Sequence, residues 1–354
     1  MKADNFRLVR KLIDAVSPSG CESPAALVFS QELPGIRIER DCIGNTSAII
    51  TPRRSLGKIM LAAHSDEIGL MVKYIDEDGF VYFSPVGAID PGVLIGVRVT
   101  MINGSGKQIH GVIGKKPIHL MDAKERERAA SMDDLFIDIG CRKKSEAEKL
   151  LAVGDTGIVE FSLDFLQKDR IAGRGLDDRI ALYVIIEVMK RLHKEKNKLN
   201  FEVFGVATTQ EEVGHRGAQV SSFNINPDCC LVIDVTHDTS YPGSSKQKDG
   251  DVTLGLGPCI CRGPILHPLL TSMIEQFAKL KKIPLQVDIG TRSTGTDSDH
   301  IQNNCGGIAT ALLEIPLRYM HTPSEMIAMG DVEKLIDLIT GFILSLKTKP
   351  DFRV

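Results

Sequence analysis

The residues best suited to chemistry are histidines and acids that lie at the ends of apolar segments. In the first such segment, an apolar run ends at His64, and Asp66 follows two residues later. Both side chains point to the same side if the extended conformation continues. A metal-ligating imidazole usually donates its other N–H to a carboxylate, so the pair fits a ligand and the residue that orients it. The alternative is a strand-end histidine beside a solvated aspartate.

Paired acids occupy two further segments. Asp177 and Asp178 follow two glycines and open a helical pattern, where an aspartate is often only a helix cap. Glu211 and Glu212 follow a fully apolar strand. Adjacent glutamates can have different roles, since one can bind a metal while the other acts as general base. For either segment alone, helix capping or a solvated pair of acids remains the alternative.

Two single residues complete the set. Asp234 interrupts a hydrophobic strand, where a lone carboxylate is costly unless it is paired or bound to a metal. His321 lies in a turn after the apolar run 308–315, and alone it would equally fit a surface histidine.

Together these side chains predict a site for two divalent metal ions. The predicted ligands are His64, Asp177, Glu212, Asp234 and His321. Each ion could take one histidine and one carboxylate, with the third carboxylate bridging. A bridging hydroxide would then balance the four positive charges of the ions. Mixed nitrogen and oxygen ligands favour zinc or cobalt over magnesium or calcium. Such a pair acidifies a shared water and polarises a carbonyl, as in aminopeptidase-type hydrolases.

The segments between these residues predict an α/β scaffold. Apolar runs with the composition of buried strands cover 47–51, 58–63 and 201–208. Helical patterns cover 179–198, 267–282 and 331–347. Strands and helices in this order predict a largely parallel central sheet with helices on both faces.

Residues 69–161 have a different character, because many short β-like runs alternate with turn signals. They predict a small β-barrel or sandwich inserted into the α/β domain. The chain would then divide into a catalytic domain of 1–68 and 162–354 and an inserted β-barrel domain of 69–161. Within the insertion, 123–134 is polar and lacks an apolar stripe, which predicts a mobile surface loop.

Composition and charge exclude several classes of protein. The chain has 354 residues, 43% hydrophobic and 25% charged, as is usual for soluble globular proteins. With 43 basic and 46 acidic residues the net charge is −3 and no long basic run occurs, so we expect neither nucleic acid nor a membrane as partner. No segment resembles a secretory signal or a membrane span, which predicts a cytoplasmic protein. The eight cysteines form no CxxC pair and are predicted to be mostly buried thiols.

These motifs resemble those of the tetrahedral (TET) aminopeptidases, a family of co-catalytic dinuclear metallopeptidases that includes glutamyl aminopeptidases and relatives named endoglucanases. The resemblance runs nearly end to end. It rests on AAHSDEIGLMV, GRGLDDR, TTQEEVGHRGA, the aspartate of LVIDVT, GTDSDHIQ and IPLRYMHTPSEM. It implies a zinc-aminopeptidase-like mixed central sheet, together with the inserted β-barrel.

The resemblance also implies a role for each residue of the set. One metal ion would be held by His64, Asp177 and Asp234, and the other by Asp177, Glu212 and His321, so that Asp177 bridges. Glu211 would be the general base, which takes a proton from the bridging water and returns it to the leaving amine. Asp66 would orient His64, and Asp178 would support Asp177.

The implied activity is removal of N-terminal residues from short peptides. A deacylase or amidase that uses the same metal pair on N-acylated amino acids or peptides is the alternative. An insertion between the first histidine and the bridging aspartate is the TET pattern, in which the inserted domain helps to build a homo-oligomer, a tetrahedral dodecamer, that controls access. Segments 237–245 and 292–300, with Thr296 and Asp297, could line the specificity pocket. His119 and His215 are predicted to be structural.

Overall fold

Four parallel strands form the centre of the larger sheet in the computed structural model, which describes residues 3–160 and 162–353. They lie in the order β12 (Glu202–Thr208), β3 (Lys58–His64), β13 (Cys229–His237) and β16 (Ala309–Arg318). Nearly every residue of these strands is buried, as expected when helices cover both faces of a parallel sheet. The parallel direction brings all four carboxyl ends to one edge.

The outer strands of this sheet make the whole sheet mixed. Antiparallel strands extend it on both sides: β1 (Arg37–Arg40) and β2 (Thr46–Ile50) beside β12, and β17 (Glu325–Ala328), β11 (Arg170–Gly173) and β10 (Asp164–Phe165) beyond β16. At β16 the sheet forks, because β14 (Cys259–Arg262) pairs with β16 and then in parallel with β15 (Gln286–Ile289). The expectation of a largely parallel sheet therefore holds for the four central strands and is wrong outside the centre, where most pairs are antiparallel.

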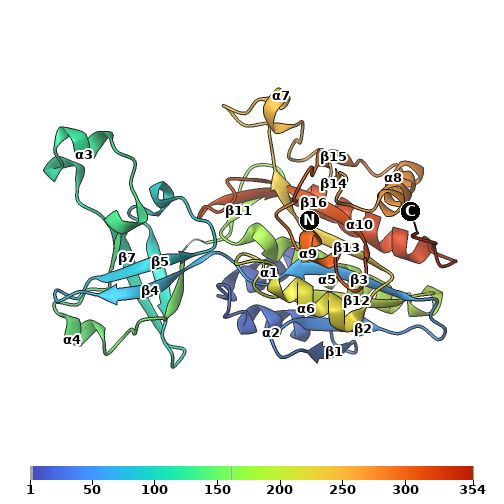
Figure 1. The fold of residues 1–354 in the computed structure, drawn as a ribbon, viewed down its shortest axis with the longest axis horizontal. Helices are drawn as coiled ribbons and strands as arrows, with labels where there is room; N and C mark the ends of the chain where they lie inside the picture. The colour runs from blue at the N-terminus through green and yellow to red at the C-terminus, as the bar shows by residue number, and fades with distance from the viewer. Residues whose placement is uncertain (1–2, 161, 354) are drawn as a thin grey trace.

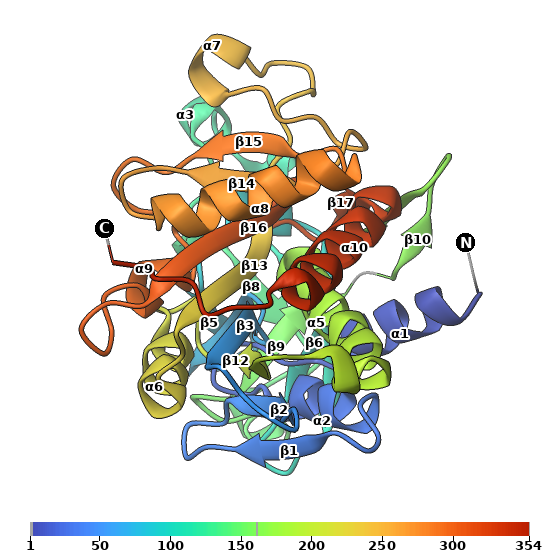
Figure 2. The ribbon, with the colours of Figure 1, turned by 90° about the vertical axis from the view of Figure 1, so that its right-hand side faces the viewer.

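Helices cover both faces of the sheet, which confirms the predicted fold class (Figure 2). One face packs against α1 (Ala3–Asp14), α2 (Ser23–Gln31), α5 (Leu176–Lys194), α8 (Pro268–Lys281) and α10 (Met329–Ser345). The other packs against α6 (Arg216–Ile225) and α9 (Ser298–Ile301). The three long helices predicted from apolar periodicity are α5, α8 and α10, with ends shifted by a few residues.

A closed antiparallel barrel lies beside the α/β part (Figure 1). Its strands, in spatial order, are β4 (Gly69–Ile75), β5 (Val81–Val86), β8 (Phe136–Asp138), β7 (Gln108–Gly114), β6 (Arg98–Ile102) and β9 (Thr156–Val159). Their inward-facing side chains form a separate apolar core. The predicted barrel is confirmed; residue 161, the predicted end of the inserted domain, lies outside the described residues.

Two sequence expectations about local structure are wrong. Residues 123–134 contain helix α3 (Ala123–Glu127) and a 3-10 turn (Met132–Asp134), because Asp122 and Glu125 form a capping box that needs no apolar stripe. The cysteines were predicted to be mostly buried, but only four of the eight are. The other four lie in surface segments: Cys21, Cys42, Cys141 and Cys305.

The remaining elements are short. They are α4 (Lys144–Ala147), α7 (Lys246–Asp249) and 3-10 turns at Pro91–Leu94, Ile118–Leu120 and Lys196–Lys198. Within the described ranges, no helix combines the length and apolar character needed to cross a bilayer.

A buried ion pair fixes the start of α5 to the end of β3. Arg179, which is 1% exposed, donates hydrogen bonds to the backbone carbonyls of Ser65 and Ala15 and to Glu67. Glu67 also pairs with Arg174. A buried charge is stable only when such partners surround it, so this network holds the two segments in one geometry.

Candidate metal centre and active site

The edge where the parallel strands end gathers three of the predicted ligands. His64 is the last residue of β3 and lies opposite Thr208, the last residue of β12. Glu212 follows in the turn after β12, and Asp234 lies on β13. Residues far apart in the sequence meet here because parallel strands end at a common edge.

Asp177 and His321 reach the same place from other elements. Asp177 lies in the non-helical first turn of α5, where the Asp177–Asp178 peptide bond is cis. His321 lies in the tight connection between β16 and β17. Ala88, in the connection that follows barrel strand β5, lines the same cavity as His321. The barrel side of the molecule therefore contributes to this edge.

Asp177 lies between the two histidines. Its Oδ1 is 3.0 Å from Nε2 of His64, and its Oδ2 is 3.3 Å from Nε2 of His321. The ligand atoms of His64, Asp177 and Asp234 all lie within 4.8 Å of one another, as do those of Asp177, Glu212 and His321. The structure thus brings together the same two groups that the resemblance implies, with Asp177 common to both.

The charges of this cluster fit divalent cations. Burial, followed by repulsion from neighbouring carboxylates, raises the pKa of Asp178 and of Glu212 well above the usual range. Both carboxylate oxygens of Asp178 and Oε1 of Glu212 lack a hydrogen-bond partner among the described residues. Buried carboxylates without partners are costly, and a bound cation removes that cost. Asp178 makes no hydrogen bond to Asp177, so the expected support does not act through one.

Asp66 contacts the ring of His64 through two groups, whereas the sequence predicted a contact with its carboxylate alone. Its Oδ1 lies 3.5 Å from Nδ1 of His64, and its backbone carbonyl lies 3.1 Å from the same nitrogen. The Asp66 carboxylate also accepts hydrogen bonds from the backbone N–H groups of Glu211 and Glu212, at 3.1 and 3.2 Å. One buried aspartate therefore positions both the first histidine and the two glutamates.

Glu325 is a site residue that sequence reasoning missed. It is fully buried, and its carboxylate accepts hydrogen bonds from the backbone N–H groups of Asp177, at 3.0 Å, and His321, at 2.9 Å. It therefore fixes the backbone of two predicted ligands. No spacing signal marks it, because its partners lie 148 and 4 residues away and are backbone groups.

The glycine before the paired aspartates has a steric role. Gly175 has φ of +60°, and a Cβ there would lie 2.7 Å from Oε2 of Glu67. Only glycine accepts both this left-handed backbone and this close approach. It lets Asp177 enter the site beside the buried Glu67.

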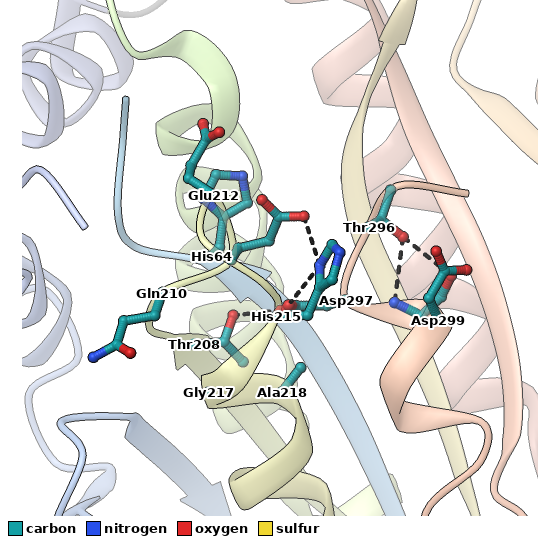
Figure 3. A network of polar contacts seen from close by, with 12 residues as sticks. His64, Thr208, Gln210, Glu212, His215, Gly217, Ala218, Thr296, Asp297 and Asp299 are labelled. Atoms are coloured by element: carbon teal, nitrogen blue, oxygen red, sulfur yellow. Dashed lines mark hydrogen bonds and ion pairs between the residues drawn. The ribbon is translucent and has the colours of Figure 1, made fainter. Parts of the chain in front are cut away.

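A second polar network lies behind Glu211 and includes His215, which the sequence analysis predicts to be structural. Nδ1 of His215 is 2.8 Å from Oε1 of Glu211 and 3.9 Å from Oδ1 of Asp297. Thr208 donates a 2.5 Å hydrogen bond to Asp297 (Figure 3). Burial, followed by repulsion from Glu211, raises the pKa of Asp297 to about 7. Asp297 occupies the N-cap position of α9, and its side chain makes no capping hydrogen bond there.

The cluster opens into a cavity of about 480 Å³, a volume typical of small-ligand sites. From the two segments expected to line a specificity pocket, the lining residues are His237, Ser293, Thr294, Gly295 and Thr296. His119 is exposed in a 3-10 turn of the barrel region and is not among the lining residues.

Comparisons with known proteins agree with this fold. A family model described as M42 glutamyl aminopeptidase matches residues 44–338. A lysyl aminopeptidase of Pyrococcus furiosus is 35% identical over 351 residues, which cover 97% of this chain and 98% of that protein.

Solved structures give the same result. An aminopeptidase of the archaeon Desulfurococcus kamchatkensis is 33% identical, with a TM-score of 0.90 over 97% of this chain and 95% of that one. The TET1 peptidase of Pyrococcus horikoshii is 29% identical, with a TM-score of 0.86 over 97% and 100% of the two chains. The resemblance to TET aminopeptidases is thereby confirmed, and the chain belongs to the M42 glutamyl aminopeptidase family and is a hydrolase of the aminopeptidase type.

Proposed function

We propose that the protein is a dinuclear metal-dependent aminopeptidase that removes N-terminal residues from short peptides. The observation that carries this proposal is the position of Asp177, whose two carboxylate oxygens face two different histidines at 3.0 and 3.3 Å. One carboxylate shared between two ligand groups fits a bridging ligand. Zinc or cobalt suits the mixed nitrogen and oxygen donors.

His64, Asp177 and Asp234 would hold one ion, and Asp177, Glu212 and His321 the other. When bound, such ions acidify a water and polarise the carbonyl of the scissile peptide bond. The protein residues supply the geometry. Asp66 and Glu325 keep the ligands in place through the backbone and ring contacts described above.

Glu211 is the proposed general base. It is 7% exposed, and its ligand atoms lie within 4.8 Å of those of His64 and Glu212. In the proposed step, the water oxygen attacks the peptide carbonyl carbon while Glu211 accepts a water proton. Glu211 then gives this proton to the leaving amine as the carbon–nitrogen bond breaks, so that no further co-reactant is needed.

His215 is proposed to position the carboxylate of Glu211, because its Nδ1 lies 2.8 Å from Oε1 of Glu211 and 3.9 Å from Oδ1 of Asp297. Loss of the 2.8 Å ion pair between Nδ1 of His215 and Oε1 of Glu211 predicts a fall in kcat of about tenfold or more for His215→Gly. Glycine keeps the left-handed backbone that His215 adopts, at φ of 54°. His215→Asn retains an N–H at the equivalent position and should recover most of kcat, with KM unchanged in both variants. Equal losses in the two variants would contradict the positioning role.

The activity is tested with short peptides that have either a free or an acetylated N-terminus. We expect amino-acid release from free peptides only, its loss after treatment with a chelator, and its recovery with zinc or cobalt. Cleavage restricted to acetylated peptides would replace the aminopeptidase proposal with the deacylase alternative. Release that persists after complete removal of metal would refute a metal-dependent mechanism.

We also propose the division into a catalytic domain of 1–68 and 162–354 and an inserted barrel domain of 69–161. Two observations support it: the barrel has its own apolar core, and its strands close on themselves. We further propose a homo-oligomer, because the TET1 peptidase of Pyrococcus horikoshii can assemble into a tetrahedron or a large octahedral shell. In such an assembly the barrel would control access to the site, to which it already contributes Ala88.

The relatives' names give opposite preferences for the N-terminal residue of the substrate. The family model is described as glutamyl, whereas the Pyrococcus furiosus relative is named lysyl. The preference of this chain therefore has to be inferred from its own cavity.

A further inference from the structure

Two carboxylates line the cavity without a place in the proposed metal centre or in proton transfer. They are Glu314 on β16 and Asp288 on β15. The other acids that line the cavity are the three proposed carboxylate ligands and the proposed base: Asp177, Glu212, Asp234 and Glu211.

Strand register places both carboxylates on the same face of the sheet as Asp234. Glu314 is the direct partner of Asp234 across the parallel pair β13 and β16, and opposite residues of a ladder point to the same face. On the other side, Glu314 is paired with Cys259 of β14, and Cys261, two residues further, is paired with Asp288. The cavity wall beside the metal centre is therefore acidic.

Glu314 is buried, and the structure shows no hydrogen bond to its carboxylate among the described residues. Its exposed fraction is 5%, and its Oε2 has no hydrogen-bond partner among the residues that the structure describes. The carboxylates of Asp234 and Asp288 lie on the same wall, so like charges face one another there. A cation placed in the cavity would satisfy this free oxygen and relieve the repulsion.

Asp288 is held against the same part of the wall. Thr236, two residues after Asp234 on β13, donates a 2.6 Å hydrogen bond to its Oδ2. The backbone N–H of Ile289 donates to its Oδ1 at 2.7 Å. The Asp288 side chain therefore turns towards the strand that carries Asp234, and it faces the cavity half-exposed.

Among the described residues, no lysine or arginine neutralises this pair. The cavity lining contains no lysine or arginine, and within residues 3–160 and 162–353 neither Glu314 nor Asp288 forms an ion pair. Two divalent ions would balance the three ligand carboxylates and Glu211. Glu314 and Asp288 would then remain as uncompensated negative charge in a largely buried wall.

We propose that Glu314 and Asp288 line the pocket for the first side chain of the substrate and select peptides with an N-terminal lysine or arginine. This inference rests on the proposed aminopeptidase function. With the scissile carbonyl at the metal centre, the first side chain can extend along the wall that begins at Asp234. Cys261 and Ile289 line the same cavity and would contact the aliphatic part of such a side chain.

The test compares p-nitroanilides of lysine, arginine, norleucine, leucine and glutamate on the metal-loaded enzyme. Norleucine has the unbranched chain of lysine without the ammonium group, so the lysine-to-norleucine ratio of kcat/KM isolates the charge. A charge-assisted hydrogen bond predicts a ratio of about ten or more in the wild type. Glu314→Gln and Asp288→Asn should each lower that ratio by about tenfold. Asp251→Asn, which removes an equal charge from an exposed residue outside the cavity, should leave the ratio unchanged.

Three other outcomes would contradict the basic preference, and one of them would also contradict the aminopeptidase function. Norleucine cleavage at least as fast as lysine cleavage in the wild type overturns the basic preference while the aminopeptidase function stands. Equal losses for lysine and norleucine in both variants would show that the carboxylates bind the α-ammonium group or support the fold, which also overturns the preference. Failure to cleave any of the five substrates overturns the proposed function and this inference together. Because Asp288 is half-exposed, its variant keeps the test available if Glu314→Gln fails to fold.

Discussion

Glu211→Gln is expected to lower kcat by about 10²–10⁴-fold while the enzyme keeps its metal ions and its fold. Glutamine has the size of glutamate but cannot accept a proton from the attacking water. The five proposed ligands are untouched, and the backbone N–H of residue 211 can still donate to Asp66. The checks are steady-state kinetics, metal content by mass spectrometry and the melting temperature.

The control for this variant is Glu127→Gln, an equal charge change in the exposed helix α3. It should leave kcat unchanged. A Glu211→Gln enzyme with substantial remaining activity would contradict the assignment of the base. Loss of activity together with loss of metal would instead indicate that Glu211 is a metal ligand. The structure allows this, because the ligand atoms of Glu211, His64 and Glu212 lie within 4.8 Å of one another.

Asp177→Ala is expected to remove both metal ions and to bring activity below detection. Asp177 is the residue common to the two ligand groups, so each proposed ion loses a ligand when its carboxylate is removed. The two histidines also lose their contacts at 3.0 and 3.3 Å, which weakens the orientation of both rings. Metal content per subunit is the direct measurement, and activity is the second readout.

The matched controls are Asp234→Ala and Glu212→Ala, because each residue belongs to only one of the two proposed three-residue sites. Each control should lose one ion more readily than the other. An Asp177→Ala protein that keeps one ion at full occupancy would contradict the bridging role. Equal loss in all three variants would mean that the two ions bind only as a unit.

Local sequence patterns predicted the central elements of the fold. The runs 47–51, 58–63 and 201–208 became β2, β3 and β12, because small and β-branched apolar residues fit a sheet that is buried on both faces. The edge strands of the sheet were harder to predict from the sequence. Strands β1, β10 and β15 are four residues or fewer and largely exposed, so no apolar periodicity marks them.

The candidate metal ligands could also be predicted from local sequence patterns. A histidine or an acid at the end of an apolar strand is costly in the core and conspicuous in the sequence, as His64 and Asp234 show. The roles proposed for His215 and Glu314 could not be predicted from the sequence, because they depend on distant partners. The proposed role of His215 rests on its contacts with Glu211 and Asp297, and that of Glu314 on the register that sets it beside Asp234.

The sequence by itself determined the residue types of the proposed metal centre, the α/β class and the presence of a barrel, since these follow from composition and periodicity within single segments. Only the tertiary structure decided which carboxylates remain without partners and which backbone groups hold the ligands. Glu325 and Asp66 act through hydrogen bonds to backbone that is brought to them by folding. Charge balance in a buried cavity depends on every side chain that reaches it, and that set is fixed by strand order and register.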